Sequence, residues 1–193
     1  MSNIELVFPE IFISLSIMFL LILGVFKKNS SKIIHNFSLL ILLITAVITF
    51  NETLSVDPTN LFNESIVIDY LSSFMKIITL LAAFVVLLIS SNYLRAFKIF
   101  KIEYPILILS SVLGMMIMIS SNDLVVFYMG LELQSLALYV LATFNRDQLK
   151  SSEAGLKYFV LSALSSGLLL YGCSLIYGFT GSTNFNVIST QFN

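Results

Sequence analysis

Six apolar stretches, each long enough to cross a lipid bilayer as a helix, constrain this chain more than any other feature. The hydrocarbon core of a bilayer is about 30 Å thick and needs roughly 20 apolar residues in helical form. Continuous apolar runs such as residues 80–89 and 107–119 lack the two-residue alternation of β-barrel strands. The sequence therefore predicts an all-α membrane protein with six transmembrane helices, at approximately residues 8–26, 34–50, 71–93, 104–120, 123–144 and 154–179.

The composition indicates that lipid surrounds most of this chain. Charged residues make up 11% of the 193 residues and hydrophobic residues 58%, whereas soluble domains carry about 25% charged residues. The formal net charge of −1 gives no reason to expect a nucleic acid or an acidic substrate as a partner. The single cysteine, Cys173, cannot form an internal disulfide, and no cluster of Cys and His residues predicts a bound metal.

Charges alternate along the connections between the apolar stretches. The connections after the first, third and fifth stretches are basic, and those after the second and fourth are acidic. Because Lys and Arg accumulate on the cytoplasmic or matrix side of a membrane, this pattern predicts that the N-terminus lies on the outer side. Lys76, near the outer start of the third stretch, is the exception, and we expect its side chain to reach the interface. The basic connections contain Lys27, Lys28, Lys32, Arg95, Lys98, Lys101, Arg146 and Lys150, and the acidic ones contain Glu52, Asp57, Glu64, Asp69 and Asp123.

The first apolar stretch is preceded by acidic rather than basic residues. Glu5 and Glu10 stand where a cleaved signal peptide would carry its positive charge. We therefore expect this stretch to be retained as a helix.

Glu132 is an acidic residue near the middle of the fifth apolar stretch. It lies about 13 Å from Asp123 along a helix, and an ionised carboxylate at such a depth costs about 2.5–3.5 kcal/mol on insertion scales. Tyr128, Ser135 and Tyr139 share its helical face and could hydrogen-bond the carboxylate or hold a chain of water. Because intramembrane acids are rare, we interpret Glu132 as a proton or ion site. The alternative is a buried carboxylate that only ties helices together.

Lys157 lies near the inner end of the sixth apolar stretch. Glu153 stands four residues before it, at the spacing of an ordinary ion pair along one helix, and the Lys157 side chain could extend to the interface. A second interpretation couples Lys157 to Glu132 across a depth difference on the order of 10 Å, through one water molecule. The ammonium would then favour the ionised carboxylate, and burial would favour the protonated one. Both interpretations stay open from the sequence.

Other polar residues have simpler structural explanations. Asp69 and Asp123 stand at helix starts, where we expect them to cap the helices. His35 adjoins a basic connection and is expected at the interface rather than in a proton relay. Residues 180–193 are polar and turn-like. A stripe of small residues in the sixth stretch predicts close packing against another helix, and it comprises Gly155, Ser162, Ser166 and Cys173.

Three segments in the second half of the chain carry a family resemblance. They read GLELQSLALYVL, EAGLKYFVLSA and GFTGSTN. Residues 123–184 closely resemble the subunit N family of proton-pumping NADH:quinone oxidoreductase (respiratory complex I), equivalent to subunit 2 of mitochondrial NADH dehydrogenase. The resemblance implies an antiporter-like fold in which Glu132 and Lys157 lie on a proton pathway.

The resemblance also implies where such a chain acts. It implies no cofactor in this chain, because NADH, FMN, the iron–sulfur clusters and the quinone belong to partner subunits of complex I. The partners would be sister antiporter-like subunits and small membrane subunits, together with the lipid bilayer and the transported protons. The implied location is a bacterial or mitochondrial inner membrane.

The resemblance divides the chain into three parts. Residues 1–103 correspond to three leading helices with their loops, residues 104–179 to the first half of an antiporter-like repeat, and residues 180–193 to a tail leading to a further helix. Members of the family are much longer and carry a broken seventh helix and a second, inverted repeat, between which pathways of this type form. We therefore expect that this part does not pump protons alone.

Two other functions are compatible with these features. A cation/proton antiporter subunit of the Mrp type shares an acidic residue in the fifth helix, although the segment GLELQSL favours the complex I subunit. A non-transporting structural or assembly fragment is the second alternative. Co-purification with flavin and iron–sulfur subunits would favour the complex I subunit over the Mrp type, and rescue of pumping by the remaining helices, supplied as a second polypeptide, would argue against a purely structural fragment.

Overall fold

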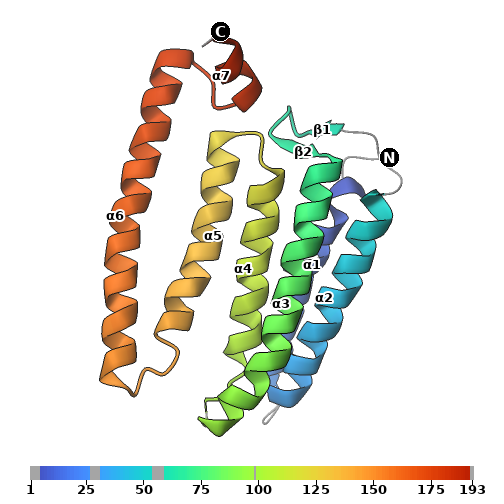
Figure 1. Ribbon diagram of the computed structural model, residues 1–193, viewed down its shortest axis with the longest axis vertical. Coiled ribbons are helices and arrows are strands. Elements are labelled where there is room, and N and C mark those ends of the chain that lie inside the picture. The colour runs from blue at the N-terminus through green and yellow to red at the C-terminus, as the bar shows by residue number, and fades with distance from the viewer. Residues whose placement is uncertain (1–4, 27–30, 54–58, 98, 192–193) are drawn as a thin grey trace.

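The computed structural model describes residues 5–26, 31–53, 59–97 and 99–191. The expectations for Lys27, Lys28, Asp57 and Lys98 fall outside these residues. Within them, six helices are long and apolar enough to span a membrane, which confirms the predicted all-α membrane fold. These helices are α1 Phe8–Phe26, α2 Ser31–Thr53, α3 Tyr70–Ala96, α4 Glu103–Ser120, α5 Leu124–Ala142 and α6 Leu149–Thr180, and they run up and down in one layer-like bundle (Figure 1).

Short elements close the end of the bundle at which the N-terminus lies (Figure 1). A 3₁₀ turn, η1 Glu5–Val7, precedes α1, and the strands β1 Thr59–Leu61 and β2 Ile66–Ile68 form an antiparallel hairpin between α2 and α3. A seventh helix, α7 Phe185–Gln191, follows α6, so the turn-like tail expected from the sequence is wrong for these residues. The hairpin buries Leu61 and Ile68 against Leu6, which fixes it over the start of α1.

Two aspartates begin helices as the sequence predicts. The Asp69 carboxylate accepts a hydrogen bond from the Ser72 backbone N–H at 2.7 Å, and the Ser72 hydroxyl accepts one from the Asp69 N–H at 3.0 Å. The Asp123 carboxylate accepts from the Val125 N–H at 2.8 Å. These bonds satisfy N–H groups that the first turn of a helix leaves unpaired.

Asp123 also connects α5 to the end of α6, because the Thr183 hydroxyl donates to its second carboxylate oxygen. Asp123→Ala removes both the cap and this connection, and we expect it to cost about 1–2 kcal/mol of stability. Asp123→Asn keeps a side-chain oxygen that can cap the helix, so this variant should retain most of the stability of the unchanged protein. Thermal unfolding of the purified protein in detergent measures the difference, with Asp147→Ala, in an exposed turn, as the control. Equal melting temperatures for Asp123→Ala and the control would contradict the role of the cap.

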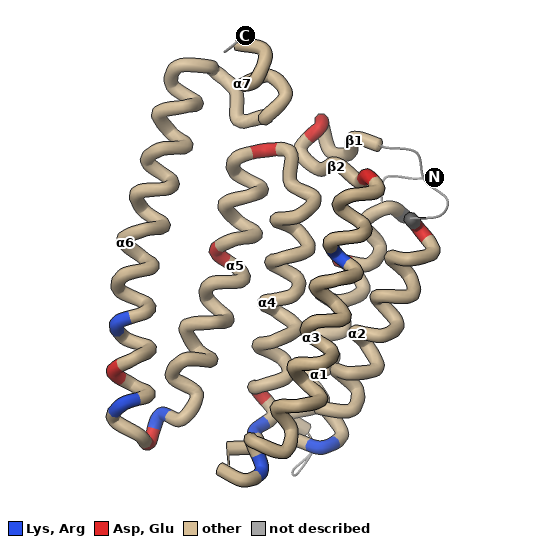
Figure 2. Tube along the Cα trace, viewed as in Figure 1, with Lys and Arg blue, Asp and Glu red and all other residues tan. Residues whose placement is uncertain are grey.

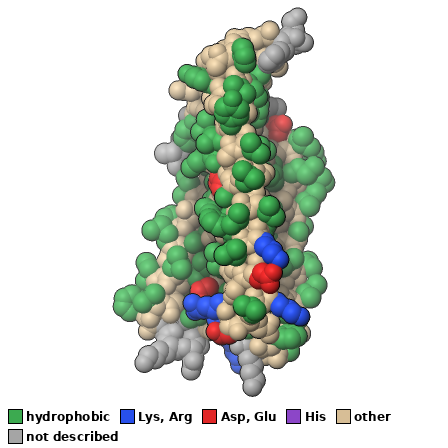
Figure 3. Space-filling view, turned by 90° about the vertical axis from the view of Figure 1, so that its left-hand side faces the viewer, with side chains coloured by type: hydrophobic (Ala, Val, Ile, Leu, Met, Phe, Trp, Pro, Cys, Tyr) green, Lys and Arg blue, Asp and Glu red, His purple; other side chains and the backbone are tan. Residues whose placement is uncertain are grey.

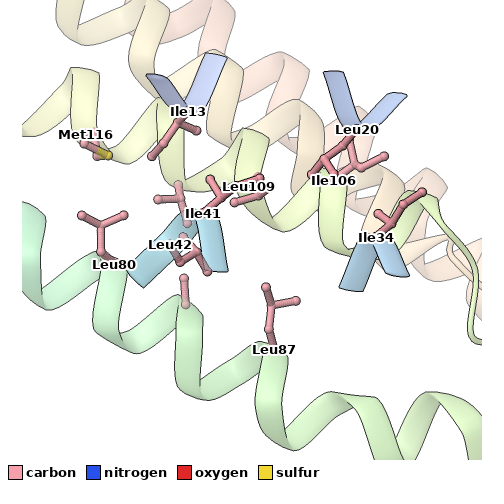
Figure 4. Close-up of a cluster of buried hydrophobic side chains, with 12 residues drawn as sticks. Ile13, Leu20, Ile34, Ile41, Leu42, Leu80, Leu87, Ile106, Leu109 and Met116 are labelled. Carbon is pink, nitrogen blue, oxygen red and sulfur yellow. The ribbon is translucent and has the colours of Figure 1, made fainter. Parts of the chain in front are cut away.

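The hydrophobic core lies among α1, α2, α3 and α4 (Figure 4). α4 packs against α1, α2 and α3 as well as α5, so the core continues across residue 103. The boundary between leading helices and repeat therefore stays a prediction that rests on family resemblance. The core comprises Ile13, Leu20, Ile34, Ile41, Leu42, Leu80, Ala83, Leu87, Ile106, Leu109, Val112 and Met116.

α5 packs on the core through a close approach of two glycines. A Cβ atom at Gly114 of α4 would lie 2.6 Å from the Gln134 backbone nitrogen and 2.7 Å from the Gly130 carbonyl oxygen of α5. A Cβ atom at Gly130 would lie 2.9 Å from the Met118 backbone nitrogen. Small residues let membrane helices approach this closely, and here they place α5 firmly on α4.

α6 is the outermost helix and packs on α5 (Figure 1). It has 32 residues, about 48 Å at 1.5 Å per residue, which exceeds the thickness of a bilayer core. Gly155 is the one buried residue among those described in α6. Figure 3 views this helix from outside the bundle and shows hydrophobic side chains over most of its length, with charged side chains gathered near its lower end. Such a surface requires a lipid or protein environment.

Charges separate toward the two ends of the bundle. In Figure 2 most basic positions gather at the lower end, apart from one in the upper part of α3. Acidic positions lie at the upper end in the hairpin, at the end of α2 and at the starts of α3 and α5, and further acidic positions lie among the basic ones at the lower end. The side of the membrane on which the N-terminus lies stays a prediction from this pattern.

Two polar residues are more buried than the sequence suggested. Lys76 is 3% exposed and pairs with Glu10 at 2.6 Å instead of reaching the interface. His35, close to the start of α2, is 4% exposed and packs its ring 5.6 Å from that of Phe100, and its position at the interface stays a prediction. Both side chains lie at contacts between helices, and these contacts depend on how separate segments pack.

Candidate functional site

Glu132 lies eight residues after the start of α5, about 12 Å along the helix axis, near mid-height of the bundle. Its side chain is half-buried, and it hydrogen-bonds a residue of α6. The carboxylate therefore lies between two helices, where protein groups replace part of the hydration that the membrane interior cannot supply.

The Glu132 carboxylate belongs to a short chain of hydrogen bonds. The Ser166 hydroxyl of α6 donates to one of its oxygens. The Ser166 and Tyr128 hydroxyl oxygens are 3.1 Å apart and hydrogen-bonded. Tyr128 thus reaches Glu132 through Ser166, although the sequence suggested a direct contact along α5. Ser166 was expected to serve only close packing, and this expectation is wrong.

A cavity of about 150 Å³ lies beside this chain, between α5 and α6. The predicted residues Ser135 and Tyr139 line it from α5, and Ser162, Ser165 and Ser166 line it from α6. A hydroxyl both donates and accepts hydrogen bonds, so this wall can hold water in several orientations. All three polar residues predicted to surround Glu132 therefore belong to one polar region, together with serines that only the fold brings there.

A second cavity, of about 340 Å³, continues toward the basic end of the bundle. Tyr139 lines both cavities, so the two adjoin at its side chain. Thr143 and Ser152 add hydroxyls to the wall of the second cavity, close to the turn between α5 and α6. Polar groups thus extend from that turn to the level of Glu132.

Aromatic packing holds Tyr139 at the junction of the cavities. Its side chain is 7% exposed. Its ring meets those of Tyr158 and Phe159 edge-on, with centroids 5.0 Å and 5.7 Å away and interplanar angles of 87° and 78°. Edge-to-face pairs of this kind are favoured by the charge distribution of aromatic rings. The position of Tyr139 is therefore defined by α6 as well as by α5.

Lys157 pairs with Glu153, four residues earlier on α6, at 2.6 Å. The two side chains are 67% and 55% exposed. This is the ordinary helical ion pair of the first interpretation, and exposed pairs of this kind contribute little stability. Among the residues that the structure describes, Lys157 makes no ion pair with Glu132, so their coupling stays a prediction.

The polar region between α5 and α6 contains a single carboxyl group, that of Glu132. It lies next to the serine hydroxyl that donates to it and to hydroxyl-lined space. Within the described ranges, no group of three or more His, Cys, Asp or Glu residues is placed to hold a metal ion.

Sequence reasoning found Glu132 and its α5 neighbours but not the role of α6. Ser162 and Ser166 are four residues apart and share a helical face. This spacing was visible in the sequence, but small polar residues in membrane helices can either allow close helix packing or hydrogen-bond a group on another helix. Only the observed contact between α5 and α6 shows that Ser166 has the second role.

Comparison with known proteins gives consistent matches. Residues 121–193 match the transmembrane region of the NADH:quinone oxidoreductase/Mrp antiporter family. NADH-quinone oxidoreductase subunit N of Pelagibacter ubique is 70% identical over 193 residues, which cover 100% of this chain and 41% of that protein. NADH-quinone oxidoreductase subunit N of Maricaulis maris is 50% identical over 189 residues, covering 97% and 39%. The chain thus spans about two fifths of the length of these curated relatives.

A solved structure shares the arrangement of the helices. A chain of respiratory complex I from Thermus thermophilus superposes with a TM-score of 0.77 at 28% identity, over 91% of this chain and 38% of that one. The chain is thus similar over its whole length to about two fifths of the NADH-quinone oxidoreductase subunit N proteins, and residues 121–193 match the NADH:quinone oxidoreductase/Mrp antiporter family.

Proposed function

We propose that the protein containing this chain translocates protons as a membrane subunit of an NADH:quinone oxidoreductase, with Glu132 as the group that takes up and releases the proton. The observation that carries the proposal is the hydrogen bond from Ser166 to Glu132 at mid-height of the bundle, beside hydroxyl-lined space. An acid held inside the membrane by a specific donor is a functional site by default.

The path to Glu132 begins at the basic end of the bundle. A proton enters the larger cavity near Ser152 and Thr143, passes Tyr139, and crosses the smaller cavity to Ser166 and Glu132. Water occupies about 30 Å³ per molecule in the liquid, so both cavities have room for water between the hydroxyls. Hydroxyls and water pass a proton along by exchanging donor and acceptor roles.

Lys157 is proposed to act at the entrance of this path, with Glu153 as its partner. Lys157 is nine residues before Ser166 on α6, about 14 Å along the axis. In the present arrangement the ammonium is held by Glu153. Release from Glu153 would free the ammonium to extend toward Glu132.

Electron transfer is assigned to partner subunits. The relatives are named NADH-quinone oxidoreductase subunit N, and we propose that NADH, FMN, the iron–sulfur clusters and the quinone are bound by other chains of that complex. The sister antiporter-like subunits and small membrane subunits would cover the apolar surface that α6 exposes. The alternating loop charges support an N-terminus on the outer side of a bacterial or mitochondrial inner membrane.

A cation/proton antiporter subunit of the Mrp type is the second candidate, because the matched family includes both kinds of protein. The fold also resembles a chain of the Mrp complex from Dietzia, with a TM-score of 0.75 at 21% identity over 95% of this chain and 36% of that one. The 70% identity to a subunit N protein favours the first candidate. Purification of the full-length protein from its native membrane distinguishes them, since flavin and iron–sulfur subunits would accompany only a complex I subunit.

Ser166→Ala in the full-length protein tests the hydrogen-bonded chain. A hydrogen bond to a charged group contributes about 1.5–3 kcal/mol, and each 1.4 kcal/mol is a factor of ten in rate. We therefore expect proton transfer through this subunit to slow about tenfold, measured as proton uptake in vesicles during NADH oxidation. Tyr128→Phe should have a smaller effect, because it leaves the Ser166 bond intact.

Ser174→Ala is the matched control for that experiment. Its hydroxyl donates to the Tyr171 carbonyl within α6 at 2.7 Å and is exposed. Proton uptake should be unchanged by this substitution. If Ser166→Ala also left proton uptake unchanged, the hydrogen-bonded chain would have no part in transport.

A further inference from the structure

A cavity at the hairpin end of the bundle lies apart from Glu132. It has a volume of about 370 Å³, and its walls come from α1, α4, the β1–β2 hairpin and the turn before α1. Pockets that bind small molecules typically have about 300–1,000 Å³ and an apolar lining with a few polar groups. Glu10, Ser14 and Ser120 are the polar residues of this lining, and its remaining residues are apolar. The cavity thus has the size and the composition of a ligand site.

Two buried oxygen atoms of this lining lack a hydrogen-bond partner. Neither the second oxygen of the Glu10 carboxylate nor the Ser120 hydroxyl has one among the described residues. The two residues are 8% and 3% exposed. The first Glu10 oxygen is occupied, since it pairs with the Lys76 ammonium at 2.6 Å. A buried acceptor without a donor is unfavourable, so the cavity favours an occupant that donates hydrogen bonds to both oxygens.

The hairpin covers these oxygens from the end of the bundle. Ile66 and Ile68 of β2 line the cavity, and Ile68 is 5% exposed because it packs against Leu6. These apolar side chains offer no polar path from the end of the bundle to Glu10 or Ser120. A donor therefore approaches the two oxygens from the side of the bundle.

The side of the cavity faces lipid. Ile11 and Leu15 line it from α1 and are 36% and 61% exposed, and α1 is one of the helices long and apolar enough to span a membrane. Leu113 and Ile117 of α4 line the cavity as well. Leu113 is seven residues before Ser120, about 10 Å along the helix axis. Below the two oxygens the cavity is therefore an apolar groove that opens toward the acyl chains of the bilayer.

Water is a poor occupant of such a space. A water molecule takes about 30 Å³ in the liquid, so a cavity of about 370 Å³ has room for about twelve. Each buried water needs about two to four polar partners, and the lining supplies three polar side chains. Glu10 stands in the first turn of α1 and Ser120 is the last residue of α4. Polar groups at the helix ends beside an apolar groove match a lipid headgroup beside its acyl chain.

We propose that this cavity binds a phospholipid whose headgroup carries a primary ammonium, as in phosphatidylethanolamine, from the leaflet at the hairpin end. The ammonium has three N–H donors. Two of them bind the second Glu10 oxygen and the Ser120 hydroxyl, and the bond to the carboxylate is charge-assisted. An acyl chain lies along the apolar groove. The lipid phosphate balances the ammonium, so binding adds no net charge beside the ion pair of Glu10 and Lys76.

The same contacts exclude the headgroups of other phospholipids. A choline headgroup has no N–H group to donate. The headgroup of phosphatidylglycerol carries a net negative charge, which would lie beside the Glu10 carboxylate. The lipid site does not depend on the proposed role of Glu132.

Photo-crosslinking tests the proposal in the assembled complex containing the full-length subunit. The complex is placed in phosphatidylcholine nanodiscs with a small fraction of phosphatidylethanolamine that carries a photoreactive acyl chain, and labelled peptides are identified by mass spectrometry. We expect labels on the groove residues Leu15, Leu113 and Ile117. Unlabelled phosphatidylethanolamine should compete for these labels. Its N-methyl and N,N-dimethyl derivatives should compete progressively less, because each methyl group removes one donor.

Two variants connect the labels with the polar groups. Glu10→Gln removes the charge from one acceptor, and we expect labelling to fall about tenfold. Ser120→Ala removes a neutral acceptor and should lower labelling about threefold. Ser110→Ala is the matched control, because its hydroxyl donates to the Ile106 carbonyl within α4 at 3.0 Å and does not line the cavity. If Glu10→Gln fails to assemble because Lys76 loses its partner, Ser120→Ala and the methylated headgroups still decide the question.

Three results would overturn the proposal. A photoreactive phosphatidylcholine or phosphatidylglycerol that labels the groove as well as phosphatidylethanolamine would show that the two oxygens select no headgroup. Absence of labels on the groove would show that no lipid enters it. Equal labelling of Ser120→Ala and Ser110→Ala, together with equal competition by all the methylated headgroups, would show that donated hydrogen bonds do not hold the lipid.

Discussion

Replacing Glu132 with Gln in the full-length protein should remove the contribution of this subunit to proton translocation. Gln keeps the size of the side chain and can still accept a hydrogen bond from Ser166, but it cannot take up a proton. Removing a group that transfers protons typically costs about 10²–10⁴ in rate. We therefore expect fewer protons moved per NADH oxidised, measured with a pH-sensitive dye in vesicles that contain the reconstituted complex.

Two comparisons make this measurement specific. Glu64→Gln changes an exposed acid in the turn of the β1–β2 hairpin, outside the α5–α6 region, and it should leave the proton yield unchanged. Glu132→Asp keeps the acid but shortens it, so it should recover part of the activity if proton transfer matters and none if only side-chain length matters. An unchanged proton yield for Glu132→Gln in a fully assembled complex would refute the assigned role.

Enlarging Gly114 should weaken the packing of α5 on α4 and lower the stability of the protein. An added Cβ atom would lie 2.6 Å from the Gln134 backbone nitrogen and 2.7 Å from the Gly130 carbonyl oxygen. Both are backbone atoms, so no side-chain rotation relieves the contact, and α4 and α5 must separate. Overpacking of this kind costs about 1–3 kcal/mol. Gly114→Val should cost more than Gly114→Ala because its side chain is branched.

The thermal stability of the purified protein in detergent measures this effect, together with the yield of assembled complex. Gly167→Ala is the matched control, because nothing lies within 4 Å of an added Cβ atom at that position of α6. The separation of α5 from α4 would also move Glu132, so proton translocation should fall with stability in the Gly114 variants. A melting temperature for Gly114→Ala equal to that of Gly167→Ala would show that the close approach is not required.

The helices and their ends could be predicted because they depend on local sequence. α1 lies where the apolar stretch 8–26 predicted it, and α4 begins within one residue of its predicted start. Asp69 and Asp123 cap helices as expected. A helix satisfies its backbone hydrogen bonds internally, so its position in lipid follows from the length of one apolar run. The hairpin after α2 and the short helix α7 were missed because they are short and lack that length signal.

The faces of the helices were harder to predict. In water, a polar face and an apolar face show which side of a helix is buried, but in lipid both the packed face and the lipid face are apolar. The sequence of α6 therefore did not show that Ser166 faces α5. The same holds for Lys76, which was expected to extend to the interface and instead pairs with Glu10, 66 positions earlier in the sequence.

The sequence by itself determined that this chain spans a membrane several times and that one acid, Glu132, lies deep within a helix. Both conclusions follow from the free-energy cost of placing a charge or an unpaired backbone group in lipid. This cost applies to each helix separately, so it can be read from one stretch of sequence at a time. The tertiary structure alone decided which groups meet that acid and that Glu10 and Lys76 form an ion pair. Those contacts join residues far apart in the chain, and they arise from close approaches such as Gly114 against Gly130 that depend on the packing of whole helices.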